Sequence, residues 1–431
     1  MKGLVKRIIG LSSLGLMTAL ASQAYAAGYK AEFQSPSVLA DAGEAAVVED
    51  AGTNWYNSAG LVYIPAQVVL GVMDVYQQTK FSGSQFAPSP FGPAFNYSAT
   101  GKASSYPNVM LPLIHVNLPL SERMSFGYSI VPAWGLDEAY GNYNFARYDV
   151  TRIHSKTIDI APSLSFRFND HWSLGIGPDF HYFSLSSNSN ALTEGPAGFG
   201  GTTGDSISRF SAERWGTGVH AGILFRLDDK TRFGLNYRSK IVNALHGHSD
   251  FVINGGGGTV IENNKFRVTI PMPPVTTFSA YRDIDQRWAI MGTISYEQWS
   301  VQRGLNGQNY QTPTGVVNVL LPQNMHNVFD FSIGTHYKYN DKWMLRGSLK
   351  YVGCPTINAF RDLNNPDDTK YGINVGARYQ MSKKVALDMM YGHVFTKAER
   401  INGFNPATGA TTQGVVHTGI DVAGIQVVWN I

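Results

Sequence analysis

Few residues of this 431-residue chain combine types and spacings that could do chemistry. His246-Gly247-His248 could bind a metal ion, but two histidines without acidic or thiol partners are more often simply polar. Gly204-Asp205-Ser206-Ile207-Ser208 is faintly similar to a serine-esterase turn, yet it lacks the Gly-x-Ser-x-Gly elbow. Gly255-Gly256-Gly257-Gly258 lacks the lysine and the helix of a phosphate loop, and Cys354 is the only cysteine. We therefore expect no enzyme, no metal and no cofactor.

The N-terminus has the pattern of a secretory signal. A basic start is followed by an apolar run from Ile8 to Leu20 and by the small-x-small site Ala24-Tyr25-Ala26. We expect cleavage after Ala26, which makes residues 1–26 the signal peptide; the alternative is a retained membrane anchor, but the run is short and interrupted by Gly and Ser. Removal of the signal peptide takes away three of the 34 Lys and Arg residues, so 31 basic residues remain, equal in number to the 31 Asp and Glu residues. The mature chain is then formally neutral, so no nucleic-acid partner is expected.

The elements that would position any site are strands joined by repeated polar turns. Each turn leads into an aromatic or aliphatic residue and then into period-two hydrophobicity, and successive turns lie about 40–60 residues apart, which fits two membrane-spanning strands and a long loop. Short turns on one side and long loops on the other are typical of an outer-membrane β-barrel. The five turns begin at Asn169, Asp228, Asp285, Asn340 and Ser382.

Alternation along the strands predicts which face meets lipid. From Ile158 to Phe168 every even position is apolar, and every odd one is small or polar. Residues 215–227 and 371–380 repeat the pattern. In a soluble sandwich the apolar face would pack on a second sheet, whereas in a barrel it contacts lipid.

Counting these segments predicts an all-β protein, an antiparallel transmembrane barrel of about 14 strands over residues 66–431 in the outer membrane of a Gram-negative cell. A closed barrel leaves no unpaired edge, so we expect a monomer. Strands are expected at 66–83, 104–119, 121–133, 150–168, 171–188, 206–227, 230–247, 262–283, 286–304, 319–340, 342–356, 368–382, 384–401 and 413–431.

Residues 27–65, which precede the first strand, are predicted to form a plug inside the lumen. Ser35-Pro36 has the pattern of an N-cap and a first helical proline, and Gly52 could close the helix. A periplasmic tail is the alternative.

One segment of this plug resembles a known family. Residues 50–61, Asp-Ala-Gly-Thr-Asn-Trp-Tyr-Asn-Ser-Ala-Gly-Leu, are similar to the plug motif of the FadL family, long-chain fatty acid transporters of Gram-negative outer membranes. The family typically has Asn-Pro-Ala where this chain has Asn57-Ser58-Ala59, and such barrels usually end in an aromatic residue where this chain has Ile431. Further similar segments follow in family order at residues 131–136, 160–164, 272–276, 296–300, 370–376 and 382–402.

The resemblance implies passive transport of a hydrophobic molecule, with a long-chain fatty acid as the first expectation. The ligand would be caught among the outer loops, pass to an apolar pocket in the lumen and leave sideways into outer-membrane lipid under control of the plug. Neutral or aromatic hydrocarbons remain an alternative, as does a general porin for small polar solutes, which would need no plug.

The resemblance also suggests where ligand and gate residues lie. For the capture groove we expect Leu192, Phe199, Phe251, Val252 and Ile253, with ordinary loop anchors as the alternative. For the inner pocket we expect Tyr29 and Phe33, and a fatty acid would also need a cation, because a buried unpaired carboxylate is costly. The candidate cations are Arg152, Arg209 and Arg214, for which structural ion pairs are the alternative, and the expected gate is Asn57, Ser58 and Ala59 against Gly127.

Overall fold

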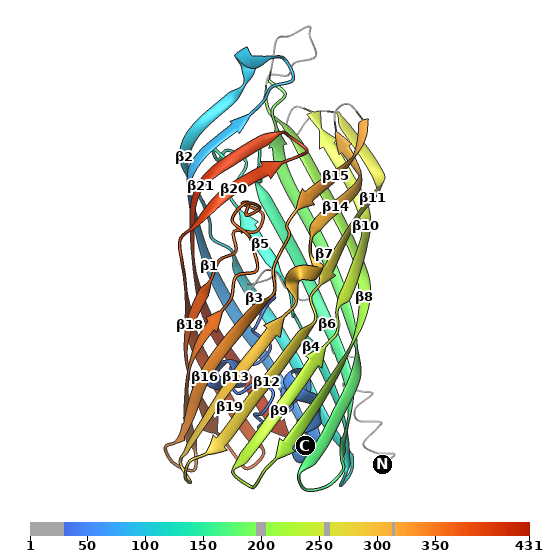
Figure 1. Ribbon diagram of the computed structural model, residues 1–431. Helices are drawn as coiled ribbons and strands as arrows, with labels where there is room; N and C mark the ends of the chain where they lie inside the picture. The colour runs from blue at the N-terminus through green and yellow to red at the C-terminus, as the bar shows by residue number, and fades with distance from the viewer. Residues whose placement is uncertain (1–29, 195–203, 254–258, 313–314) are drawn as a thin grey trace.

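Antiparallel strands close into one barrel, as the side view shows (Figure 1). The computed structural model describes residues 30–194, 204–253, 259–312 and 315–431, so the expected signal peptide 1–26 and the Gly255–Gly258 loop lie outside the described residues. The barrel closes where β1 (Gln67–Ala87) pairs with β21 (Ala410–Asn430), in register from Gln67↔Asn430 to Phe86↔Thr411. No helix among the described residues is long and apolar enough to cross a membrane.

In the described parts of the chain, twenty-one strand segments make fourteen passes, because seven passes are each broken into two segments. The predicted antiparallel barrel of about 14 strands is therefore confirmed. The unbroken passes besides β1 and β21 are β6 (Arg152–Arg167), β7 (Trp172–Ala191), β8 (Ser206–Arg226), β17 (Trp343–Val352) and β18 (Lys370–Gln380). The broken passes are β2 (Tyr97–Ser105) with β3 (Asn108–Ser121), β4 (Met124–Val131) with β5 (Leu136–Ala139), β9 (Thr231–Arg238) with β10 (Ile241–Val252), β11 (Val260–Met272) with β12 (Val275–Asp283), β13 (Trp288–Glu297) with β14 (Gly304–Thr312), β15 (Gly315–Pro322) with β16 (Val328–Lys338), and β19 (Val385–Thr396) with β20 (Glu399–Asn405).

The short turns at the lower end of Figure 1 share one local device. In all five repeated turns, the side-chain oxygen of the first residue accepts hydrogen bonds from the backbone N–H groups two and three residues later. Asn169, for example, accepts from His171 and Trp172, both at 2.9 Å. Asn, Asp and Ser stabilise turns in this way, which explains why they begin each repeat.

Alternation sorts the two faces of the wall as predicted. On β6, Leu164 is 48% exposed on the outside, whereas its neighbour Ser163 is 2% exposed toward the lumen. Several strands run further outward than expected: β1 continues to Ala87, and β2 occupies residues predicted to be loop. The polar composition of these extensions, which resembles that of loops, hid them from the sequence analysis.

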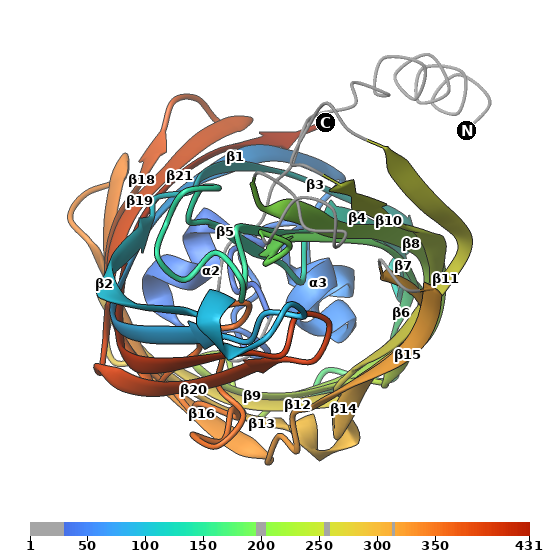
Figure 2. The same ribbon diagram turned by 90° about the horizontal axis from the view of Figure 1, so that it is seen from above.

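Residues 30–65, the described part of the plug, lie inside the ring of strands (Figure 2). They form α2 (Pro36–Asp41), α3 (Thr53–Asn57) and the 3-10 helix η1 (Ser58–Tyr63). Ser35 caps α2 as expected, with its hydroxyl accepting from Val38 N–H. The expected helix end at Gly52 is wrong, because Ala42 adopts a left-handed conformation (φ 62°) and ends α2 there. Gly52 instead precedes α3.

Candidate ligand-binding site

An apolar cavity of about 110 Å³, here the outer cavity, lies between the outer half of the wall and the outer loops. Since an apolar cavity of about 150 Å³ can hold benzene, the space suits a small ring or part of an alkyl chain. Its apolar lining consists of Leu136, Ile153, Phe183, Leu185, Phe210, Ile270, Leu305, Tyr310, Val319, Leu321, Phe404, Pro406 and Ala407.

Packed aromatic rings hold one side of the outer cavity. Phe210 of β8 and Phe266 of β11 have ring centroids 4.9 Å apart, and Tyr310 of β14 lies edge-on to both. The hydroxyl of Tyr310 hydrogen-bonds that of Ser208 at 3.0 Å. Because the buried hydroxyl has a partner, Tyr310 can present its ring to the cavity without an unsatisfied polar group.

The polar end of the outer cavity is acidic. Asp149 and Asp362 come from two outer loops and both line the space, together with Asn364 and Asn365. Burial and the nearby charge of Asp362 raise the pKa of Asp149 to about 8, and burial also raises the pKa of Asp362. Among the described residues that line this cavity, there is no Lys, Arg or His. The outer cavity therefore offers hydrogen-bond acceptors but no cation for an anionic ligand.

A second cavity of about 80 Å³, here the inner cavity, lies between the plug and the wall. Unlike the outer one it is rich in charge. Arg238 of β9 bonds Asp179 of β7 at 2.5 Å and stacks 3.5 Å above the ring of Trp55 in the plug. The other charged residues that line it are Lys30, Glu32, Glu44 and Asp159.

The two cavities follow one another along the same strands. Leu136 lines the outer cavity, whereas Trp134, two residues earlier, lines the inner one. Ile270 and Met272 of β11 are divided in the same way. Ile270 and Met272 face the same side because residues two apart on a strand do so, and Trp134 lies two residues before the start of β5, so both pairs mark the boundary between the cavities.

The plug is held to the wall by buried ion pairs around Arg346 of β17. This side chain bonds Asp388 of β19 at 2.6 Å, lies 3.4 Å from Asp41 in α2 and also pairs with Glu49. Burial, with a further contribution from the charge of Glu49, raises the pKa of Asp41 to about 7. The plug therefore depends on a wall cation to balance its acidic groups.

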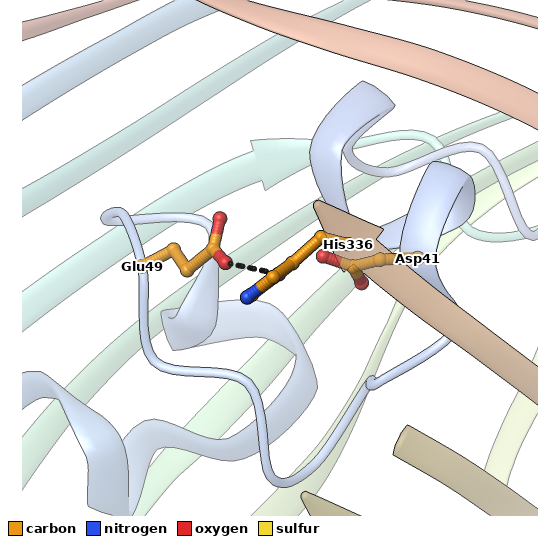
Figure 3. Close-up of side chains that lie close together, drawn as sticks. All are labelled: Asp41, Glu49 and His336. Carbon is orange, nitrogen blue, oxygen red and sulfur yellow. Dashed lines mark ion pairs between the residues drawn. The ribbon is translucent and has the colours of Figure 1, made fainter. Parts of the chain in front are cut away.

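Three of the neighbouring side chains carry atoms that could ligate a metal (Figure 3). Nδ1 of His336 lies 3.2 Å from Oε1 of Glu49, and the carboxylate of Asp41 is the third member of the group. However, the guanidinium of Arg346 already contacts both carboxylates. A second acidic group, Glu32, Glu297 and Asp330, is similarly approached by lysines. We assign both groups to plug docking.

Strand pairing is interrupted in the wall next to the plug. β3 pairs with β4 only from Ile114 onward, and in the described chain residues 108–113 of β3 have no partner in β5. β5 instead bends inward, as the view from above shows (Figure 2), and Glu138 accepts hydrogen bonds from Gln77 and Thr79 of β1. Residues 108–113 still pair with β1 on their other side, and Met110 among them is 62% exposed. We call this interruption the wall break.

The plug contacts the wall break directly. Lys30 forms a β-bridge with Trp134, and the N–H of Ala31 donates to the carbonyl of Ala133 at 2.8 Å. The first described residues of the plug thus occupy the edge left free where β4 ends.

The residues expected in the capture groove lie elsewhere. Phe251 and Val252 are buried in β10, Ile253 follows them, and Leu192 packs at the rim beside Tyr148; none of these lines either cavity. Phe199 lies outside the described residues. The outer cavity is instead built largely from strand residues. The available signal was the lumen face of β7, which changes from small and polar residues to Phe183 and Leu185.

The expected inner-pocket residues also lie away from the cavities. Arg152 and Arg209 are about half exposed and pair with Asp137 and Asp250, while Arg214 is exposed and bonds His246. None of the three arginines lines a cavity. Phe33 is buried in the main core without lining one either, and Tyr29 lies outside the described residues.

The expected gate residues contact different strands. Asn57 donates to the carbonyls of Ala45 and Ile223, and the carbonyl of Ala59 accepts from Ser165 and Ser173. A Cβ on Gly175 would lie 2.3 Å from the hydroxyl of Ser58. Gly127 instead faces Asn54 and Leu61, since a Cβ there would lie 2.2 and 2.4 Å from their side chains. The expected gate residues therefore lie against β6, β7 and β8, whereas Gly127 of β4 meets Asn54 and Leu61 of the same plug motif.

Comparison with known proteins identifies the family. Residues 17–429 match the sequence profile described as "Outer membrane protein transport protein (OMPP1/FadL/TodX)". The chain belongs to this family. FadL-family members are transporters of the Gram-negative outer membrane, so this chain is an outer-membrane transporter of hydrophobic compounds.

Relatives and solved structures agree with this family. The long-chain fatty acid transport protein of Escherichia coli O6:H1 is 26% identical over 89% of this chain and 90% of the relative. Outer membrane protein P1 of Haemophilus influenzae is 21% identical over 90% and 89%. A Pseudomonas aeruginosa FadL homologue has the same fold, with a TM-score of 0.80 at 19% identity over 94% of this chain and all of that one. The Pseudomonas putida toluene transporter TodX gives 0.70 at 18% identity, over 95% and 98%.

Proposed function

We propose that this FadL-family barrel takes up hydrophobic molecules passively through three sites in series. The ligand enters the outer cavity, passes the boundary at Leu136 and Trp134 into the inner cavity, and leaves through the wall break into the membrane. The observation that carries this proposal is the succession of the two cavities on the same strands, beside an interruption of strand pairing.

Lateral exit is the thermodynamically economical route. Each buried CH₂ group contributes about 0.8 kcal/mol, so release of an alkyl chain into periplasmic water is steeply unfavourable. Release into lipid replaces one apolar environment with another, and it needs no energy source.

Long-chain fatty acids are the first candidate ligands, because relatives of that name match this chain over about nine-tenths of its length. Small neutral hydrocarbons, including aromatic ones, are the second candidate. Two features support them: the outer cavity has the size of a small ring, and its described lining has no cation.

The plug distinguishes this proposal from a general porin for polar solutes. Deleting residues 27–60 should raise ion conductance in planar bilayers, because the lumen loses its filling, and should abolish saturable uptake of a hydrophobic substrate into cells. Unchanged conductance together with unchanged hydrophobic uptake would reject a functional plug. Full-length protein in the same bilayers is the control.

Uptake itself is tested with labelled oleate and labelled toluene in cells that lack their own FadL-type transporters. Expression of the chain should accelerate uptake of at least one of them above that of cells expressing an unrelated outer-membrane barrel. If neither is taken up faster while a small sugar enters freely, the porin reading replaces the proposal.

A further inference from the structure

The acidic end of the outer cavity contains an unsatisfied acceptor. The Thr412 hydroxyl and the Leu363 N–H approach the carboxyl group of Asp149, yet its buried Oδ2 forms no hydrogen bond with a described residue, and Asp149 is only 3% exposed. Leaving such an atom unpaired costs stability, so its presence in a cavity points to a group that is supplied from outside.

Asp362 lies against the same spot from a separate loop. A Cβ built on Gly403 would be 2.9 Å from Oδ2 of Asp149 and 3.2 Å from Cβ of Asp362. The two carboxyl groups therefore flank one small space beside a glycine. Above about pH 8, where Asp149 loses its proton, a third carboxylate placed there would meet like charge without a described cation in the lining, whereas a neutral donor would still meet acceptor oxygens.

We propose that the outer cavity selects ligands with an uncharged, hydrogen-bond-donating head group, such as an alcohol or a phenol, which donates to Asp149 while the apolar body packs among Phe183, Phe210 and Leu305. This inference rests on the proposed function and narrows its substrate class. A fatty acid would enter this cavity in its protonated form, which is also a neutral donor.

The test compares three ligands with one ring each. Benzyl alcohol and anisole are isomers, but only the alcohol has a donor, and benzoate is an anion. Binding is measured at pH 9, where Asp149 has lost its proton, by isothermal titration to the purified full-length mature barrel in a non-ionic detergent. The variants are Asp149→Leu, which removes the acceptor, Asp149→Asn, which removes the charge, keeps one acceptor oxygen and adds an NH₂ donor, and Asp362→Leu. Asp250→Asn is the matched control, because Asp250 is a buried aspartate that lines neither cavity.

In the unmodified protein we expect benzyl alcohol to bind at least about tenfold more tightly than benzoate. Asp149→Leu should weaken binding of benzyl alcohol about tenfold relative to anisole, while the affinity for anisole itself changes little. Asp149→Asn should strengthen benzoate binding several-fold, and Asp250→Asn should leave both ratios unchanged.

Two results would overturn the inference: benzoate binding as tightly as the alcohol, or alcohol-to-anisole ratios that stay constant in both leucine variants. Heat-modifiable mobility on gels shows which variants fold, and if both leucine variants fail to fold, the benzoate response of Asp149→Asn decides. If none of the three ligands binds, the outer cavity is not a ligand site and the proposed function fails as well. If anisole binds but the alcohol is not favoured over benzoate, the inferred head-group selectivity fails while the proposed function stands.

Discussion

The two cavities of this barrel lie two residues apart along shared strands, yet they differ in charge. Ion pairs between plug and wall, such as Lys30–Glu297 and Lys350–Glu32, lie at the inner cavity, whereas the described lining of the outer cavity has two aspartates and no basic residue. Charges in the lumen thus serve mainly to dock the plug, and the outer cavity, which we propose receives the ligand first, is mostly apolar. The inner cavity therefore stabilises the plug, whereas we propose that the outer cavity binds the ligand. Substitutions at each of the two cavities can test this division.

The largest expected effect is on the charged side. Arg346→Met leaves Asp41, Glu49 and Asp388 without their shared cation, and breaking such a buried network costs about 3–5 kcal/mol. The urea midpoint of the barrel in detergent micelles should fall, and protease should cut the plug more readily. Arg287→Met, on an exposed turn, is the control. Equal midpoints for the two variants would mean that these ion pairs do not dock the plug.

The next effect is on the apolar side. Leu305→Trp adds bulk to the outer cavity, so uptake should fall about tenfold through a loss of ligand binding of about 1–3 kcal/mol. Leu320→Trp, on the neighbouring strand with an exposed side chain, adds the same bulk outside the cavity and should leave uptake unchanged. Initial rates of labelled-substrate uptake at matched expression measure both. The cavity lies off the transport route if the two variants behave alike.

A smaller effect is expected where the plug approaches the wall most closely. Gly127→Ala would place a methyl group 2.2 Å from Asn54, which must shift at a cost of about 1–3 kcal/mol. The nearest atom to a Cβ on Gly292 is 3.5 Å away, so Gly292→Ala is the matched control. Thermal unfolding in detergent, followed by gel mobility, should show a lower unfolding temperature for Gly127→Ala than for Gly292→Ala. An unchanged unfolding temperature for Gly127→Ala would show that Asn54 can move away at no cost in stability.

The smallest expected effect concerns the acidic end of the outer cavity. The pKa of Asp149 is raised to about 8, above the value of about 3.9 of an unfolded chain. Between these values the folded state keeps a proton that the unfolded state has lost, so this contribution is full below about pH 3.9 and is lost as pH rises to about 8. Asp149→Asn should flatten the stability profile in that window by at least about 1 kcal/mol. Chemical denaturation at several pH values measures it, and parallel profiles would contradict the prediction.

Much of the fold was predictable because local chemistry encodes it. The turn residues that begin each repeat bond their own backbone, and the alternation from Ile158 to Phe168 correctly assigns the lipid face. The early end of α2 was not predictable in this way. It depends on a left-handed Ala42, a conformation that sequence preference would assign to glycine, and on contacts with the wall.

The candidate site was harder to predict because it depends on strands distant in sequence. Phe210, Ile270 and Leu305 converge only when the barrel closes, and Asp149 meets Asp362 only after two loops fold over the lumen. Apolar residues expected in the outer loops were the candidates instead, but one of them, Phe251, is buried in strand β10. A search for apolar residues on the lumen-facing register would have found Phe183 and Leu185.

The seam between β1 and β21 bears on how the molecule is assembled. Its twenty paired positions join the earliest strand to the last one, so the cylinder stays open until the final segment has been delivered. Residues 30–65 precede that earliest strand and end up enclosed, with their acidic groups paired to arginines of β17 and β18. The N-terminal segment therefore has to lie inside the curved sheet before β1 and β21 pair, where Arg346 and Arg378 can bind its acidic groups.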